Sequence, residues 1–322
     1  MTKRKKICVL GGTGFVGQQI VERLARHGHH IKILSRHRER NRDLLVLPTV
    51  EIVTADVHNG QVLKEQFTGQ DVIINLVGIL NVFGKNNFDK VHTDLASKIG
   101  DACQLKQIPR LLHMSALKAN ANNAPSKYLR SKGQAENIVH TIRGVKVTSF
   151  QPSVIFGPHD SFFNRFARLL AMPPRFMPFP LACANARFAP VYVCDVANAF
   201  VESIDNKETY NKRVALCGPR EYTLLELVQY INEICQTRRK IIPLGNATSK
   251  LMASFLGMVP GKPMTVDNYL STLVDSVCDN EIPNLITDHA TSVESIVPQY
   301  LGGKSLRGRF DQFRKGARRM TG

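Results

Sequence analysis

Residues 7–17 read Ile7-Cys8-Val9-Leu10-Gly11-Gly12-Thr13-Gly14-Phe15-Val16-Gly17, an apolar run that leads directly into a cluster of glycines. The pattern predicts a strand, a tight turn and a helix, because an apolar helical stripe continues through residues 20–24. Glycines at this spacing let the chain turn sharply, let a pyrophosphate approach bare backbone and let the helix pack closely on its strand. The unpaired N–H groups at the start of the helix favour negative charge. The segment therefore predicts a dinucleotide-binding turn.

The second predicted strand, residues 31–34, ends at Ser35 and Arg36. An acidic residue at this place would bind the 2′-hydroxyl of an NAD ribose, whereas a hydroxyl and an arginine suit a 2′-phosphate. We therefore expect NADP(H) in preference to NAD(H). The alternative is that Arg36, Arg38, Arg40 and Arg42 form only a solvated basic loop.

Further strands are expected at residues 50–53, 72–76 and 110–115, with a long helix at about 88–106. Strands that alternate with helices at this spacing predict a doubly wound parallel α/β sheet of the Rossmann type, with helices on both faces. Ligands of such sheets gather at the carboxyl ends of the strands. Asp56 and Val57 are placed there to meet the adenine end of the cofactor, and Gly78 lets the cofactor approach the backbone.

Two side chains suited to proton transfer follow the expected fifth strand. Ser115 ends that strand, and Tyr128 and Lys132 lie four residues apart, on one face of a predicted helix. A lysine beside a phenol is expected to lower the pKa of the phenol, because the positive charge favours the phenolate. Tyr128 is then the candidate acid or base, and Ser115 the group that holds the substrate oxygen. A chance Tyr-x-x-x-Lys pattern on an ordinary helix is the alternative.

The length of 322 residues suits a nucleotide domain followed by a smaller one. We place the domains at residues 1–217 and 218–322, because residues 214–216 are expected to return to the sheet and Thr223 with Glu226 predicts a helix capping box. The smaller domain is expected to be mainly helical. Residues 162–188 are rich in Phe, Leu, Met and Pro, so the loops within 156–190 are expected to contribute to a lipophilic substrate cleft. Ordinary packing between the domains explains this composition too.

Seven cysteines are scattered along the chain and form no C-x-x-C pair. We expect reduced core residues, with neither a disulfide framework nor a metal site. No apolar stretch is long enough to span a bilayer, and the basic N-terminus precedes a glycine turn rather than the apolar core of a signal peptide. A cytoplasmic protein is therefore expected.

The net charge of +17 indicates anionic partners. Apolar side chains recur at helical spacing between Lys and Arg residues over 304–320, which predicts a basic amphipathic segment. Such a segment can lie on the inner face of an anionic membrane, and it can equally dock on the protein itself or fray. Nucleic acid is not expected as a partner, because the basic residues are dispersed and no known binding motif accompanies them.

Together these segments resemble the short-chain dehydrogenase/reductase superfamily, in its extended or atypical branch, over most of the chain. The matching pieces are residues 11–17, 56–57, 75–78, 115, 128, 132, 151–158 and 190–197. Segments 75–80, 113–117, 128–132 and 275–278 look like the bacterial relatives of the dehydrogenase-like accessory subunit of respiratory complex I.

This resemblance implies an NADP(H)-dependent oxidoreductase that moves a hydride to or from a carbonyl or hydroxyl carbon of a lipophilic, quinone-related substrate. It implies nucleotide contacts from Gly11, Thr13, Gly14, Phe15, Val16, Gly17, Ser35, Arg36, Asp56, Val57, Leu76, Val77, Gly78, Lys132 and Pro152. Two alternatives stay open. One is a nucleotide-loaded scaffold that supports respiratory-complex or quinone-synthesis assembly without catalysis, and the other is a nucleotide-sugar epimerase or dehydratase.

Two positions depart from the pattern of the extended branch. Gln151 stands where these proteins usually carry an arginine, and His92 where an asparagine often joins the proton relay. A histidine can relay protons, but a packed or hydrogen-bonded histidine is the alternative. Neither change removes Ser115, Tyr128 or Lys132.

Overall fold

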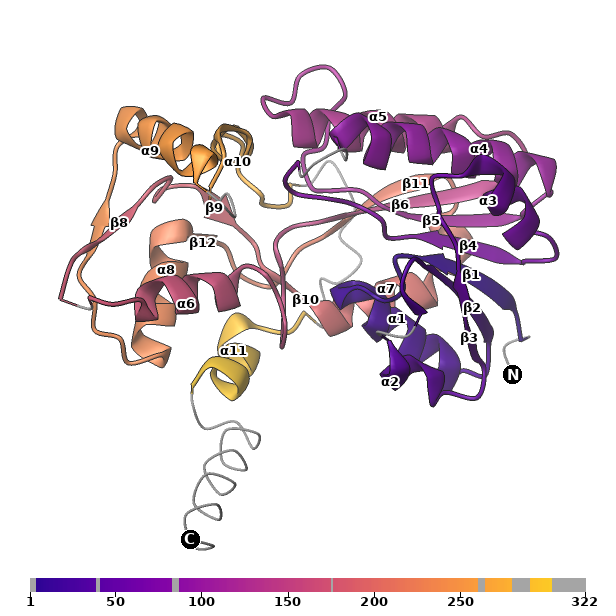
Figure 1. Cartoon of the computed structure of the whole chain (residues 1–322), viewed down its shortest axis with the longest axis horizontal. Helices are drawn as coiled ribbons and strands as arrows, with labels where there is room; N and C mark the ends of the chain where they lie inside the picture. Colours follow the sequence, from indigo (N-terminus) through magenta and orange to yellow (C-terminus); the bar gives the residue numbers. More distant parts are fainter. Residues whose placement is uncertain are drawn as a thin grey trace, which may run out of the picture.

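The computed structural model describes residues 4–38, 41–82, 87–174, 176–259, 264–279 and 290–302. A seven-stranded parallel sheet organises the larger lobe, in the order β11-β6-β5-β4-β1-β2-β3 (Figure 1). Its strands are β1 (Lys6–Leu10), β2 (His30–Ser35), β3 (Val50–Thr54), β4 (Val72–Asn75), β5 (Arg110–Met114), β6 (Lys146–Pro152) and β11 (Lys212–Leu216). The predicted doubly wound α/β sheet is confirmed.

The strand order reverses beside β1, which pairs with β2 on one side and β4 on the other. Ile7 lies opposite Ile31 in β2 and opposite Val72 in β4. The connections leave β1 and β4 toward opposite faces of the sheet, so a crevice opens outside their carboxyl ends. The glycine turn after β1 lies at this crevice.

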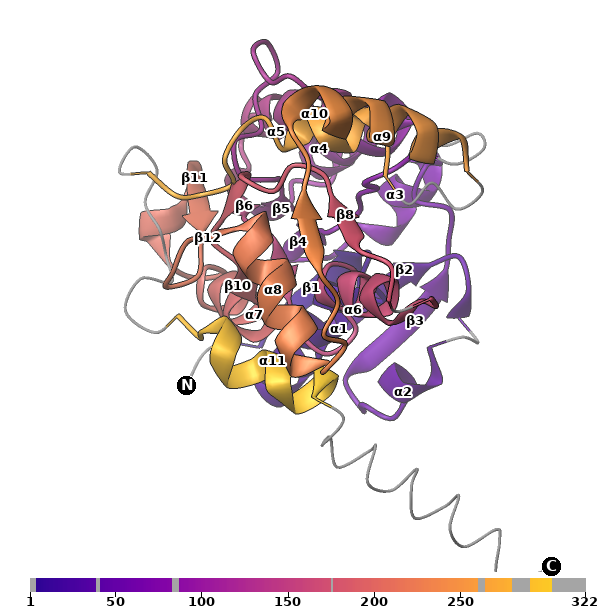
Figure 2. The ribbon, with the colours of Figure 1, turned by 90° about the vertical axis from the view of Figure 1, so that its left-hand side faces the viewer.

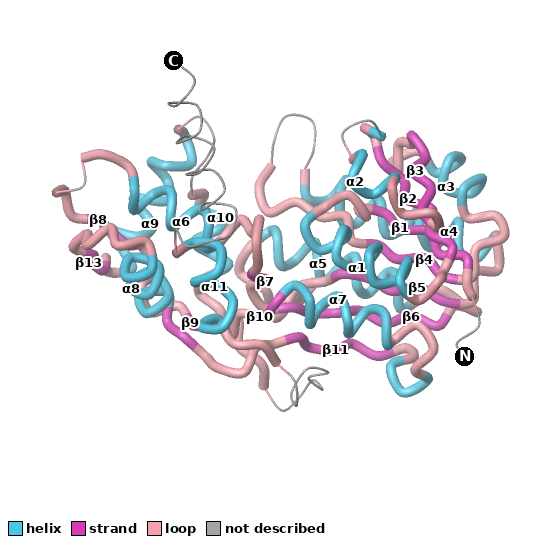
Figure 3. Tube along the Cα trace, turned by 90° about the horizontal axis from the view of Figure 1, so that it is seen from below, coloured by secondary structure: helices cyan, strands magenta, loops and turns pink. Residues whose placement is uncertain are grey.

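Helices cover both faces of the sheet because each lays an apolar stripe on it (Figures 1 and 3). One face carries α1 (Phe15–Arg26), α2 (Arg42–Leu45) and α7 (Val193–Glu202). The other carries α3 (Gly60–Gln66), α4 (Leu95–Leu105) and α5 (Lys127–His140). Alternate residues of β1 point to the two faces: Val9 joins the core under α1 and α7, and Leu10 joins the core under α4 and α5.

The long helix expected from about residue 88 begins with a π-helical segment, η2 (Asp89–Asp94), before α4. Such segments widen a helix locally and are frequent at functional sites. Here the segment orients Phe88 and His92 toward α5, where both rings contact the Tyr128 ring.

A smaller lobe, which faces the viewer in Figure 2, packs around a hydrophobic core of its own. Its elements are β7 (Ile155–Phe156), α6 (Phe163–Ala171), β8 (Phe179–Leu181), β9 (Arg187–Phe188), β10 (Val191–Tyr192), β12 (Tyr222–Thr223), α8 (Leu224–Ile234), β13 (Ile241–Pro243), α9 (Asn246–Met258), α10 (Val266–Ser271) and α11 (Val293–Leu301). In the larger lobe, a short 3-10 turn, η3 (Lys207–Thr209), precedes β11. The capping box predicted at Thr223 and Glu226 is confirmed at the start of α8. Phe156, Phe163 and Phe188 are buried in this core. Their burial agrees with the alternative that the apolar residues of these loops serve packing.

Residues after α10 return to the sheet and tie the lobes together. Ser276 pairs with Phe188, and its carbonyl accepts a 2.6 Å hydrogen bond from the Ser153 hydroxyl just beyond β6. Two residues later, Cys278 forms a disulfide with Cys217, which follows β11. The expectation that all cysteines are reduced is therefore wrong for this pair, because the fold brings together two residues separated by 61 positions. The other five cysteines are free.

Several expectations concern parts of the chain outside the described residues. The basic segment 304–320 lies there, as does Arg40. Within the described ranges, no helix combines the length and the apolar character needed to cross a bilayer. The division at residues 217 and 218 stays a prediction.

Candidate functional site

The glycine turn between β1 and α1 has the geometry of an anion cradle. Gly11 has a φ of +79°, a conformation that favours glycine, and its carbonyl accepts a 3.0 Å hydrogen bond from the Gly14 amide. A methyl group on Gly17 would lie 2.3 Å from the Gly11 carbonyl oxygen, so a larger residue cannot fit there. Gly14 begins α1 without a side-chain cap, which leaves the first N–H groups of the helix free to bind phosphate.

The other predicted nucleotide contacts lie along the same edge of the sheet. Ser35 is the last residue of β2 and is buried, while Arg36 beyond it is exposed. Asp56 follows β3, and its carboxylate accepts a 3.0 Å hydrogen bond from the His58 amide. Burial lowers the pKa of His58, and the positive charges of Lys90, Lys98 and Arg36 add to this effect.

The end of β4 lies between the glycine turn and α5. A methyl group on Gly11 would lie 3.2 Å from the Leu76 carbonyl carbon, so the turn and the end of β4 are in contact. A methyl group on Gly78 would lie 2.9 Å from Lys132 Nζ and 3.4 Å from His92 Nε2. Any side chain at position 78 would displace the Lys132 ammonium group.

Ser115 and Lys132 meet at the end of β5. The Lys132 ammonium donates a 3.0 Å hydrogen bond to the carbonyl of Met114, the residue before Ser115. The Ser115 hydroxyl is buried and has no hydrogen-bond partner within the part of the chain that the structure describes. A buried, unpaired hydroxyl costs free energy, so this group is available to a ligand.

Tyr128 is half-buried in the first turn of α5 and packs against a small cluster that includes Ala116. The expectation that Lys132 lowers the pKa of Tyr128 is wrong, because burial raises the pKa of this phenol to about 12. Burial also lowers the pKa of Lys132 to about 8, against the opposing effect of the Glu136 carboxylate. Both shifts favour the neutral forms of the two side chains.

His92 is a hydrogen-bonded histidine within this site. Its Nε2 accepts a 3.1 Å hydrogen bond from the Ile79 amide, so the proton of the neutral ring is on Nδ1, which lies 2.8 Å from the Ser131 hydroxyl. Burial, and then the charge of Lys132, lower the pKa of His92 to about 2. The hydroxyl of Ser131 in turn donates to the Tyr128 carbonyl at 2.8 Å. His92 therefore joins η2 to α5, which agrees with its interpretation as a packed, hydrogen-bonded histidine.

Asp267 in α10 is a site residue that the sequence analysis missed. Its two carboxylate oxygens accept hydrogen bonds from the amides of Lys127 at 2.7 Å and of Tyr128 at 3.1 Å. Ser126 caps the same helix from its own chain segment, through a 3.1 Å bond from the Leu129 amide. The start of the helix that carries Tyr128 is thus held by the smaller lobe. The capping box of α10 is visible in the sequence, but where that helix docks is not.

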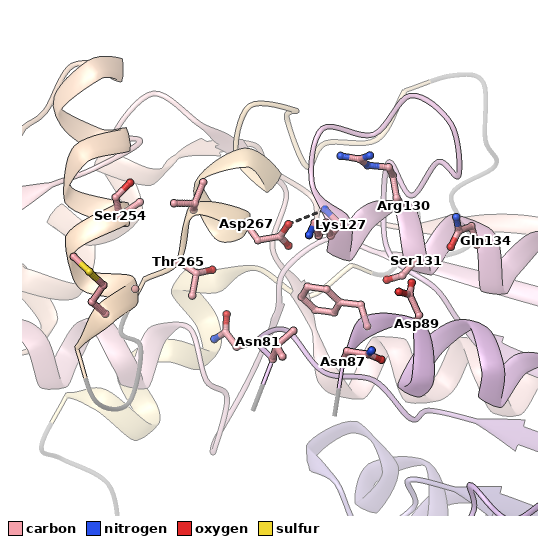
Figure 4. A pocket seen from close by; sticks show the side chains of 16 residues that line it. Asn81, Asn87, Asp89, Lys127, Arg130, Ser131, Gln134, Ser254, Thr265 and Asp267 are labelled. Carbon is pink, nitrogen blue, oxygen red and sulfur yellow. Dashed lines mark hydrogen bonds between the residues drawn. The ribbon is translucent and has the colours of Figure 1, made fainter. Parts of the chain in front are cut away.

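A pocket of about 850 Å³ lies between α9 and α10 on one side and α5 with η2 on the other (Figure 4). Polar side chains from both lobes line it, including those of Asn81, Lys127 and Thr265. Phe88 also lines the pocket, and its ring contacts the rings of His92 and Tyr128 at centroid distances of 5.9 and 6.0 Å. The pocket therefore adjoins Tyr128, and none of its lining residues among those that the structure describes comes from the loops within 156–190.

Comparisons with known proteins agree with this geometry. The NAD(P)H-binding family matches residues 11–157, which run from the glycine turn to the end of β7. NADH dehydrogenase [ubiquinone] 1 alpha subcomplex subunit 9, mitochondrial, of Mus musculus is 28% identical over 289 residues, 86% of this chain and 74% of the mouse protein. The match and these relatives confirm the resemblance to NAD(P)H-binding proteins of the extended short-chain dehydrogenase/reductase type.

Two further proteins that the chain resembles are enzymes by name. The ceramide reductase of Caulobacter vibrioides is 27% identical over 201 residues, 62% of this chain and 60% of that protein. The solved structure of UDP-N-acetylglucosamine 4-epimerase from Methanobrevibacter ruminantium M1 superposes with a TM-score of 0.68 over 97% of this chain and 100% of that one. At 17% identity, the likeness to the epimerase shows the fold alone.

Gln151, which departs from the usual family pattern, is part of a buried polar cluster below the site. Its side-chain amide lies 3.0 Å from both carboxylate oxygens of Glu136 on α5. The positive charge opposite Glu136 comes from Arg213 in β11, which forms a salt bridge with it. The cluster joins α5 to β6 and β11, and so holds the helix of Tyr128 and Lys132 from its far end.

Proposed function

We propose that this protein is an NADP(H)-dependent reductase of a lipophilic carbonyl compound. The observation that carries the proposal is the unpaired Ser115 hydroxyl beside Lys132 at the carboxyl ends of β4 and β5, with Tyr128 one helical turn before Lys132 on α5. Ser115 offers an unpaired buried hydroxyl, Lys132 holds an ammonium group beside Gly78, and Tyr128 adjoins a pocket of about 850 Å³. Bound NADPH would supply the hydride.

The cradle at Gly11, Gly14 and Gly17 fits a pyrophosphate, because it combines bare backbone with free N–H groups and leaves no room for a Cβ at position 17. Exposed Arg36 supports NADP(H) over NAD(H), since a guanidinium forms strong hydrogen bonds with phosphate. Lys132 would hold the nicotinamide ribose, which is the role that the resemblance implies for it.

The side chains suit reduction of a carbonyl group. With a pKa of about 12, the Tyr128 phenol is protonated at neutral pH and can donate its proton to a carbonyl oxygen. The Ser115 hydroxyl can donate a second hydrogen bond to that oxygen.

The test follows NADPH absorbance with quinones and carbonyl lipids as substrates. We expect Tyr128→Phe to lower turnover by about 10²–10⁴-fold, while NADPH affinity is retained. Tyr230→Phe is the matched control, because Tyr230 is half-buried on α8, outside the pocket. Arg36→Ala should weaken NADPH binding by about tenfold and leave NADH binding unchanged. Turnover that survives Tyr128→Phe unchanged would refute the catalytic role.

A nucleotide-loaded scaffold is the second candidate, supported by the similarity to the mouse NADH dehydrogenase subunit over 86% of the chain. In this case NADPH copurifies, exchanges slowly and raises the melting temperature, and none of the substrates is reduced. Nucleotide binding with no turnover would favour the scaffold. Absence of nucleotide binding would overturn both candidates.

A further inference from the structure

Helix α9 exposes three of its large apolar side chains, while two of its small residues are fully buried. Leu251, Phe255 and Met258 follow one another at helical spacing and are 72%, 64% and 77% exposed. Ser249 and Ala253, on the opposite side, are fully buried. The orientation is fixed by a 3.1 Å hydrogen bond from the Cys183 amide to the Ser249 hydroxyl oxygen. A helix at a water-facing surface would show the reverse arrangement.

A second exposed apolar group lies in the same lobe. Met172, Phe176 and Met177 lie in the loop between α6 and β8, and Phe176 is 88% exposed. The loop is held in place by Arg239, which donates hydrogen bonds to the carbonyls of Met177 at 2.8 Å and Leu169 at 3.0 Å. Both apolar groups belong to the end of the molecule far from the seven-stranded sheet (Figures 1 and 3).

The charge of these segments identifies the kind of surface that they fit. Residues 161–194 and 235–266 contain nine Lys or Arg residues and no Asp or Glu. Lys250 lies on α9 beside Leu251 and is exposed. Of these cations, Arg187 forms salt bridges with Glu221 and Asp275. Exposed apolar side chains in segments with an excess of cations suit the headgroup region of an anionic bilayer, which attracts the cations and buries the apolar groups.

We propose that α9, together with the loop 172–177, docks this protein on an anionic lipid bilayer. The pocket beside Tyr128 is lined on one side by α9, through residues that include Ala253, Gly257 and Met258. Docking therefore brings the rim of the pocket to the lipid surface, where a lipophilic molecule can enter without crossing water. This inference goes beyond the proposed reductase activity, since binding to lipid needs no turnover.

The test measures sedimentation of the full chain with vesicles of phosphatidylglycerol and phosphatidylcholine, and with pure phosphatidylcholine vesicles. We expect binding to the anionic vesicles that weakens with salt. The double variant Leu251→Ser/Phe255→Ser should weaken it by at least about tenfold, since two apolar side chains no longer enter the bilayer. The matched control is Val46→Ser/Leu105→Ser, which alters two exposed apolar residues of the larger lobe.

The chain has no tryptophan, so one substituted residue can report its own environment. Emission of Phe255→Trp should shift to the blue when anionic vesicles are added, and emission of Leu105→Trp should not. All variants keep the basic tail, so a contribution from residues 304–320 is common to them. Unchanged binding of the double variant, or no shift for Phe255→Trp, would overturn the proposal. A dimer in sedimentation velocity that the double variant dissociates would overturn it too, by assigning this face to a second copy.

Discussion

Replacement of Asp267 by alanine tests the link between the smaller lobe and the site. The change removes two carboxylate hydrogen bonds, at 2.7 and 3.1 Å, from the first turn of α5. It also removes a negative charge from the positive end of the helix. Because the freed N–H groups of Lys127 and Tyr128 can reach water, we expect a loss of about 1–2 kcal/mol in the free energy of unfolding.

Urea unfolding followed by circular dichroism measures this loss. Asp267→Asn keeps one of the two acceptor oxygens and loses the other together with the charge, so its free energy of unfolding should fall by about half as much. Asp101→Ala is the control, because Asp101 is exposed on α4 and has no hydrogen bond to its side chain among the described residues. If Asp267→Ala costs no more than Asp101→Ala, α10 does not hold α5 and the reasoning is refuted.

The same variant separates positioning from nucleotide binding. Tyr128 lies in the turn that Asp267 caps, whereas the glycine turn belongs to another part of the sheet edge. If the reductase proposal holds, kcat should fall severalfold in Asp267→Ala, while the Kd for NADPH stays within about twofold of the original. Loss of NADPH affinity without loss of kcat would contradict a positioning role.

Three further changes have expected outcomes. Gly17→Ala should abolish NADPH binding in titration calorimetry, because the added methyl group overlaps the turn, whereas Gly60→Ala should bind normally, since its methyl would lie 3.8 Å from the nearest neighbour. Burial lowers the pKa of Lys132 from 10.5 to about 8. Between these two pH values the unfolded state binds more protons than the folded state, so the free energy of unfolding should rise with pH by up to about 3 kcal/mol. Urea unfolding of Lys132→Met should not show this rise. If the free energy of unfolding depends on pH equally in both proteins, the assignment of the rise to Lys132 is refuted. Reduction of the Cys217–Cys278 disulfide should lower the free energy of unfolding by about 2–4 kcal/mol; two free thiols in the native, unreduced protein would contradict the pairing.

Much of the larger lobe could be predicted from local patterns. The apolar run and glycines at 7–17 indicate β1, its turn and α1, and strands that alternate with helices imply the parallel sheet. The position of the site at the carboxyl edge of the sheet follows from that topology, because the residues after parallel strands all lie at one edge. For this reason Ser115 and Gly78 could be assigned to one site before their contacts were known.

The environment of the site could not be predicted in the same way. The motif of Tyr128 and Lys132 suggests a lowered phenol pKa, but the pKa depends on how deeply the fold buries the ring, and burial raises it. Likewise, the sequence shows the cap of α10 without showing that Asp267 reaches α5. Both properties depend on contacts between residues far apart in the chain.

The smaller lobe shows most clearly what could not be predicted from the sequence. Helical periodicity can show that α9 has an apolar side, yet it cannot show that Ser249 and Ala253 face the core while Leu251 and Phe255 face outward. Nor do seven scattered cysteines reveal that Cys217 and Cys278 meet. Hydrogen bonding and side-chain periodicity act over a few residues, so they define strands, turns and helices. Which faces become buried, and which distant groups meet, depends on how those elements pack.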